Sequence, residues 1–151
     1  MSDANSQEAG EAKIVRAVLR LARRLRRPAS DGEITGSGLG LLALLHRQGP
    51  MSAVALARGE GLQPQSLSRL LVRLEDAALI ERPTDPADRR RQLIALTDAG
   101  ATALHRAMAR RRQWLANAMS QRLDSSDRLT LLAASDVMLR LAGETQEDDD
   151  G

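Results

Sequence analysis

The sequence predicts a mainly α-helical protein with one small β-hairpin. Leucine and alanine dominate its apolar residues, and valine and isoleucine are few. Trp114 is its single tryptophan, and the sequence has no phenylalanine or tyrosine. This composition favours helices through intrinsic propensity. Apolar residues recur at helical spacing along most of the chain, and the stretch from about residue 79 to 96 breaks that period. With 151 residues, the chain is long enough for one domain with its own core.

Acidic residues collect at the two ends of the chain. Residues 1–12 carry three of the 20 acids, residues 141–151 carry five, and neither end carries a base. Residues 13–140 therefore hold all 22 basic residues against 12 acids, a net charge of +10, and 21 of those bases are arginine. We expect disordered acidic ends at 1–10 and 143–151, and a single domain over 11–142. The basic body suits nucleic acid, although a solvated arginine-rich surface would give the same charge.

The first predicted helix covers about residues 11–27 and ends before Pro28. Arginines lie off its apolar stripe, which consists of Ile14, Val18, Leu21 and Leu25. A basic amphipathic helix can also lie on an anionic membrane surface. Because the stripe has no aromatic anchor, a dimerisation or core-packing helix is favoured.

Two short helices are expected next. Residues 30–40 are rich in glycine and serine and predict a loop, after which leucines form a helix that stops at Gly49-Pro50. Ser52 is suited to cap a helix over about 53–58, and the glycines of residues 59–61 can make the tight turn that follows.

Residues 63–78 predict a helix with one apolar and one polar face. Pro64 falls in its first turn, where proline is tolerated. The apolar face consists of Leu67, Leu70, Leu71 and Leu74. A short helix, a glycine-containing turn and a second helix of this kind form the helix-turn-helix pattern.

A hairpin and two long helices complete the chain. Residues 79–82 and 92–96 predict two strands, joined by a charged loop at 83–91 with two prolines and three consecutive arginines. Thr97 is a candidate N-cap for a helix over about 99–121, with Asp98 complementing its dipole. The last helix is expected from Ser125 or Ser126 to Leu141.

Several functions are disfavoured. The chain has no cysteine, which excludes disulfides, thiolate metal ligands and thiol redox sensing. His46 and His105 lack metal-ligand spacing, and no nucleotide-binding or hydrolase motif is present, so we expect neither a metal, nor a cofactor, nor an enzyme. No secretory signal or membrane span is evident, which predicts a cytoplasmic protein without membrane contact.

The run LQPQSLSRLLVRLEDAALIERPTDPADRRRQLIALTDAG resembles the MarR family of bacterial winged helix-turn-helix transcriptional regulators. The order of parts carries the resemblance: the polar-faced helix, Leu74-Glu75 before residues 79–82, Asp88-Arg89-Arg90 as a D-x-R motif, and residues 96–100 opening the next helix. It covers about residues 40–105. Ala78 stands where the family pattern often has glycine.

The resemblance implies a homodimer in which helices at about 11–27 and 99–142 form the interface, with a winged helix-turn-helix over about 39–98. It also implies a repressor that releases a pseudo-palindromic duplex operator when a small-molecule effector binds between lobe and dimer helices. The chain lacks the cysteines of oxidant-sensing members and the phenylalanines and tyrosines expected around a phenolic effector. His46 and Trp114 are candidate pocket residues, while core or dimer packing is the alternative for both.

The major groove admits one helix, whose polar N-terminal residues reach base edges. The candidates for this contact are Gln63, Gln65, Ser66, Ser68, Arg69 and Arg73. Glutamine suits adenine, arginine suits guanine or phosphate, and serine suits phosphate. In the wing, the resemblance implies that Asp88 braces the hairpin while Arg90 reaches the backbone or minor groove. Arg89 and Arg91 are phosphate contacts or solvated charges. A winged helix that binds another protein instead of DNA is the alternative function.

Overall fold

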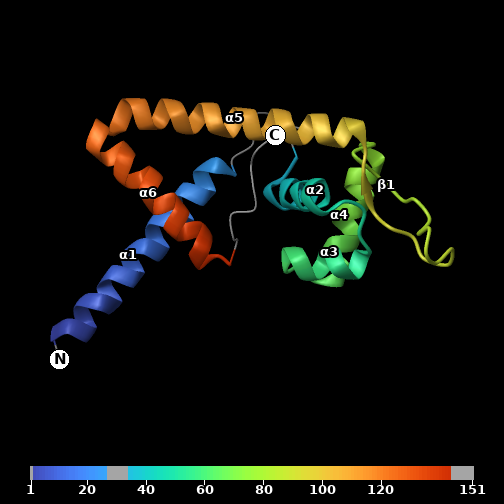
Figure 1. Cartoon of the computed structure of the whole chain (residues 1–151), viewed down its shortest axis with the longest axis horizontal. Helices are drawn as coiled ribbons and strands as arrows, with labels where there is room; N and C mark the ends of the chain where they lie inside the picture. Colours follow the sequence, from blue (N-terminus) through green and yellow to red (C-terminus); the bar gives the residue numbers. More distant parts are fainter. Residues whose placement is uncertain (1, 27–33, 144–151) are drawn as a thin grey trace. The chain divides into compact units, whose positions relative to one another are not determined.

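The computed structural model describes residues 2–26 and 34–143 (Figure 1). Contacts divide the chain into two compact units, Met1–Arg111 and Arg112–Gly151. The elements are α1 (Ser2–Leu25), α2 (Gly36–Gln48), α3 (Ala53–Glu60), α4 (Pro64–Asp76), β1 (Ile80–Glu81), β2 (Ala95–Leu96), α5 (Asp98–Arg122) and α6 (Ser125–Leu141). The predicted fold class, mainly α with one small hairpin, is confirmed. One domain over 11–142 stays a prediction, because α5 runs through both units.

The apolar core of the first unit is built from leucines. Its largest fully buried side chains are Leu41, Leu42, Leu45, Leu56 and Ile94. They come from α2, α3 and the strand region before β2, and the four leucines of α4 join them. The α2 helix contributes more buried residues than α3, α4 or α5, so it is the central helix of this core.

The α1 helix begins at Ser2, so the structure draws residues 2–10 as helix, and disorder at this end stays a prediction. At residues 7–9, glutamine, glutamate and alanine are good helix formers and favour continuation of the helix N-terminal to its apolar stripe. The Gln7 side chain donates a hydrogen bond to Glu11 one turn later, at 3.3 Å. Residue 27 and Pro28 lie outside the described residues, as do residues 144–151 of the tail predicted over 143–151.

The predicted loop over residues 30–40 is wrong at its C-terminal end, since α2 begins at Gly36. Thr35 caps this helix and accepts a hydrogen bond from the Gly38 N–H at 3.4 Å. Gly38 and Leu39 are already buried. The glycines of this segment have low helix propensity and so predict a loop. Burial of the segment outweighs that low propensity.

The hairpin is shorter than the sequence suggested. Each strand has two residues, in the register Ile80 with Leu96 and Glu81 with Ala95. Ile94 pairs instead with Met51, which precedes α3. The second strand therefore splits its hydrogen bonds between two partners, and regular pairing with the first strand ends early. Farther out, a single bridge joins Thr84 to Gln92.

The second unit contains the end of α5 and all of α6. Asp124 caps α6 and accepts a hydrogen bond from the Asp127 N–H at 2.8 Å. The predicted range of this helix is confirmed. No residue of α6 is buried, although Leu129, Leu132 and Val137 lie along it. Among the described helices of both units, none is long and apolar enough to cross a membrane.

Candidate nucleic-acid interface

A tight turn joins α3 to α4. The Ser52 hydroxyl accepts a hydrogen bond from the Ala55 N–H at 3.2 Å, so α3 begins where the sequence predicted. Gly61 ends it in the left-handed region with φ of 61°, and the Leu62 N–H donates to the Ala57 carbonyl at 2.9 Å. This geometry confirms the helix-turn-helix predicted from the glycines.

The α4 helix presents a polar face to solvent. Pro64 occupies its first turn, and Gln63 precedes it without a capping side-chain hydrogen bond. The four leucines of the opposite face are each at most 4% exposed. Burial of that stripe fixes the rotation of the helix. All six predicted contact residues are exposed: Gln63, Gln65, Ser66, Ser68, Arg69 and Arg73.

Ser68 differs from the other candidates on α4. Its hydroxyl donates to the Pro64 carbonyl at 2.9 Å, inside the same helix. A phosphate oxygen needs a donor, and the Ser68 proton is already used. Ser68 is therefore a weaker phosphate contact than the sequence suggested.

Two aspartates shape the loop between the strands, which we call the wing loop (residues 83–91). Asp88 accepts a hydrogen bond from the Arg90 N–H at 3.0 Å, and Asp85 accepts one from the Ala87 N–H at 2.8 Å. The backbone closes the loop through Asp85 N–H to the Arg91 carbonyl at 2.9 Å. Asp88 therefore braces the hairpin through the main chain of Arg90, which leaves the arginine side chain free of that role.

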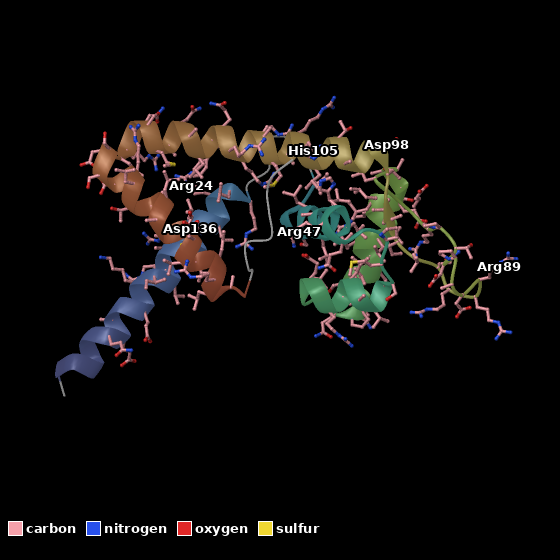
Figure 2. All side chains as sticks on the ribbon, viewed as in Figure 1. Arg24, Arg47, Arg89, Asp98, His105 and Asp136 are labelled. Carbon is pink, nitrogen blue, oxygen red and sulfur yellow. The ribbon has the colours of Figure 1, made fainter. Side chains whose placement is uncertain are left out.

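The three arginines of the wing loop are exposed: Arg89, Arg90 and Arg91. Figure 2 shows Arg89 at the far end of the loop, pointing away from the helices of the lobe. In Figure 1 the loop extends well beyond α4 and β1. Three fixed positive charges on a braced loop can meet phosphates or enter a groove without reorganising the lobe.

Two side-chain links hold the wing against α4. Arg82, which follows β1, donates its Nε–H to both carboxylate oxygens of Glu75, at 3.0 and 3.1 Å. The Thr97 hydroxyl donates to the Ala78 carbonyl at 2.7 Å and accepts from the Gly100 N–H at 3.0 Å. Thr97 thus caps α5, as predicted, and also ties that cap to the turn after α4.

That turn requires a left-handed residue. Ala78 has φ of 56°, and the Leu79 N–H returns to the Leu74 carbonyl at 2.9 Å. This conformation explains why glycine is common at the position. An alanine in the left-handed region costs about 1–2 kcal/mol.

Replacing Ala78 by glycine is expected to stabilise the protein by about 1 kcal/mol, because the relief of left-handed strain exceeds the added chain entropy of glycine. Urea unfolding of the two proteins measures the difference. Ala77→Gly is the matched control, since Ala77 has φ of −83°, and it should destabilise. Equal stabilities for Ala78→Gly and the parent would contradict the strain.

His46 on α2 and His105 on α5 meet edge to face, with ring centroids 5.2 Å apart and an interplanar angle of 87°. Both are exposed. Figure 2 shows where His105 lies on α5. Trp114 is half-buried and belongs to the second unit, so the two candidate pocket residues fall in different units. Within residues 2–26 and 34–143, no three His, Cys, Asp or Glu side chains gather to hold a metal ion.

Glu60, at the end of α3, lies against α2. A side chain at Gly40 would overlap the Glu60 carboxylate, so glycine leaves the room that this group occupies. Burial raises the pKa of Glu60 above its ordinary value of 4.5, and the charge of Arg47 partly opposes the rise. Desolvation therefore outweighs the attraction.

Because the folded state holds the Glu60 proton to higher pH than the unfolded chain does, ionisation of Glu60 lowers the free energy of unfolding. The stabilising contribution of the protonated Glu60 carboxyl is complete below pH 4.5 and is lost as the pH rises through the raised pKa of Glu60. Glu60→Gln is therefore expected to be more stable than the parent at pH 7, with the gain shrinking as the pH falls through the raised pKa and vanishing below pH 4.5. Denaturant unfolding across this range, with Glu81→Gln as the charge-loss control, tests it. A gain that persists unchanged at low pH would contradict it.

Comparison with known proteins identifies the lobe. The sequence model of the MarR family matches residues 34–91. An HTH-type transcriptional regulator of Mycobacterium tuberculosis is 32% identical over 145 residues, which cover 96% of this chain and 99% of the relative. The chain belongs to the MarR family. It is a DNA-binding transcriptional regulator of the winged-helix type.

Two further relatives of this MarR-family chain are informative. The crystal structure of a candidate transcriptional regulator from Pseudomonas aeruginosa is 33% identical, with a TM-score of 0.79, and the match covers 95% of this chain and 99% of that one. The HTH-type transcriptional repressor NicR of Pseudomonas putida is 29% identical over 76 residues, about half of each chain (50% and 48%). The match to the Pseudomonas aeruginosa structure extends the similarity beyond the helix-turn-helix to the outer helices.

Sequence reasoning missed several residues around this MarR-family site. Glu75 and Arg82 form the only ion pair between α4 and the wing in the part of the chain that the structure describes, and their opposite charges seven residues apart were the available signal. Glu60 was treated as a turn residue. No sequence signal joins His46 to His105, since 58 residues separate them.

Proposed function

We propose that this MarR-family protein is a ligand-responsive repressor that binds a pseudo-palindromic duplex operator as a homodimer. The single observation that carries the DNA-reading part is α4, whose buried leucine stripe forces a row of glutamine and arginine side chains outward. A rigid helix with this polar face fits the major groove. The contact residues are Gln63 and the five candidates on α4, together with Asp88 and the three wing-loop arginines, Ser68 contributing least.

The dimer is supported by the apolar side chains that α1 and α6 leave in solvent. Ile14, Val15 and Leu19 on α1 are each more than half exposed, and so are Leu129, Leu132 and Leu141 on α6. Helices that leave apolar side chains in solvent gain stability when a second copy covers those side chains. A two-fold dimer would present two α4 helices to half-sites about one helical turn apart.

Repression is supported by the likeness to NicR, whose name describes a repressor. A small-molecule effector is also proposed, with His46 of the first unit and Trp114 of the second unit as separate candidate contacts. A cytoplasmic location is part of the same proposal, because the protein must reach the chromosome.

The experiment that tests the function is selection of genomic fragments with the purified protein, followed by affinity measurements at several salt concentrations. Recovery of one pseudo-palindrome, with affinity that falls steeply with salt, supports a dimeric duplex reader. Binding that ignores sequence would favour the alternative, a winged helix that recognises a protein. Light scattering of the free protein gives its oligomeric state independently.

A further inference from the structure

One apolar side chain interrupts the polar face of α4. Val72 is 52% exposed. Of the large apolar side chains that are exposed within residues 2–26 and 34–143, only Val54 and Val72 lie outside α1, α5 and α6. The dimer helices therefore account for the other exposed side chains but not for these two.

Val72 stands in line with the base-reading candidates. Gln65, Arg69 and Val72 follow one another at spacings of four and three residues, which places them in one row along the helix. The row lies opposite the buried leucines. It turns acidic at Asp76, where repulsion by phosphates ends the surface that can approach DNA. Val72 is thus the last residue of the row that a base edge can approach favourably.

Stability does not explain a valine here. A β-branched residue on the exposed face of a helix is a poorer helix former than alanine, and half of its surface stays in water. Its branched methyl groups would gain from contact with another apolar group. In the major groove, the apolar group that projects from the base edges is the 5-methyl group of thymine.

We infer that Val72 is a specificity-determining residue that packs on the 5-methyl group of a thymine in each operator half-site. The inference rests on the proposed function and deepens it, since it names a base that Gln65 and Arg69 do not read by hydrogen bonding. Valine selects thymine over cytosine at that position because cytosine lacks the methyl group. The contact adds no charge, so it leaves the salt dependence of binding unchanged.

The test uses the full-length protein and the duplex recovered by genomic-fragment selection. Thymines are replaced by deoxyuridine, one symmetric pair at a time, which removes only the methyl groups. At one pair, the parent protein should lose about fourfold in affinity per half-site, or about 15-fold with both half-sites changed. Val72→Ala should bind the thymine duplex more weakly by about the same factor and should not respond to deoxyuridine at that pair.

Two variants complete the design. Val72→Thr keeps one methyl group and should retain part of the thymine dependence. Val54→Ala makes the same chemical change at an exposed valine on α3, which is 71% exposed, and should retain all of it. Because alanine is a better helix former than valine, loss of folding is not expected for either alanine variant, and circular dichroism verifies this.

Equal affinity of the parent for every deoxyuridine duplex would overturn the inference and leave the proposed function standing. The same holds if Val72→Ala keeps the full thymine dependence, since another residue would then read the methyl group. Failure of the parent to select any duplex would overturn the proposed function and the inference with it.

Discussion

Arg90→Ala is expected to weaken binding to the recovered operator by roughly 1–3 kcal/mol while the protein remains a dimer. The Asp88 carboxylate holds the Arg90 backbone rather than its side chain, so truncation removes the guanidinium without unfolding the wing loop. A dimer carries two wings. The slope of the logarithm of affinity against the logarithm of salt concentration should therefore fall by about two. Fluorescence anisotropy at several salt concentrations gives both quantities.

Arg122→Ala is the matched control for Arg90→Ala. Arg122 is an exposed arginine in the last turn of α5, so the variant loses the same net charge at a residue that belongs to the second unit and not to the wing loop. Arg90→Lys keeps the charge but not the planar fork, and it should recover the salt slope while regaining only part of the affinity. An Arg90→Ala protein that binds as tightly as the Arg122→Ala control would contradict the role of the wing.

Gly100→Ala is expected to destabilise the protein by about 3 kcal/mol, the upper end of the usual range for overpacking. A methyl group at this position would overlap the Leu79 carbonyl oxygen, and the Leu96 side chain also lies in its path. Backbone cannot move aside as a flexible side chain can. The clash would push the start of α5 from the turn after α4, so the Thr97 hydrogen bonds to Ala78 and Gly100 should weaken together.

Thermal and urea unfolding measure the effect of Gly100→Ala, and Gly10→Ala supplies the control. Gly10 lies in α1 with nothing within 4 Å of an added methyl group, so alanine there should stabilise the helix by roughly 0.5–1 kcal/mol. The two substitutions therefore have opposite expected signs. Comparable stabilities for both variants would show that α5 can shift without cost.

The sequence by itself determined the helices, the helix-turn-helix and the order of the wing. Local sequence patterns predict these features: the leucine stripe of α4, the capping residues Ser52 and Thr97, and the glycine of the turn at Gly61. Each depends on spacings within one or two turns of chain, which periodicity and hydrogen-bonding preference report directly. Six residues of the candidate DNA interface were predicted from the same patterns, and the four of the wing loop from the resemblance to the MarR family. All ten are exposed.

Only the tertiary structure decided where distant segments meet. Met51 pairs with Ile94 in a β-bridge, and this pairing shortens the hairpin. The Glu60 carboxylate packs against Gly40. His105 joins His46 across two helices. None of these contacts leaves a local pattern, because each arises when packing of the leucine core brings together residues that are far apart in the chain. The same packing holds the start of α2 helical despite its glycines and fixes which side of α4 faces outward, and with it the exposure of Val72.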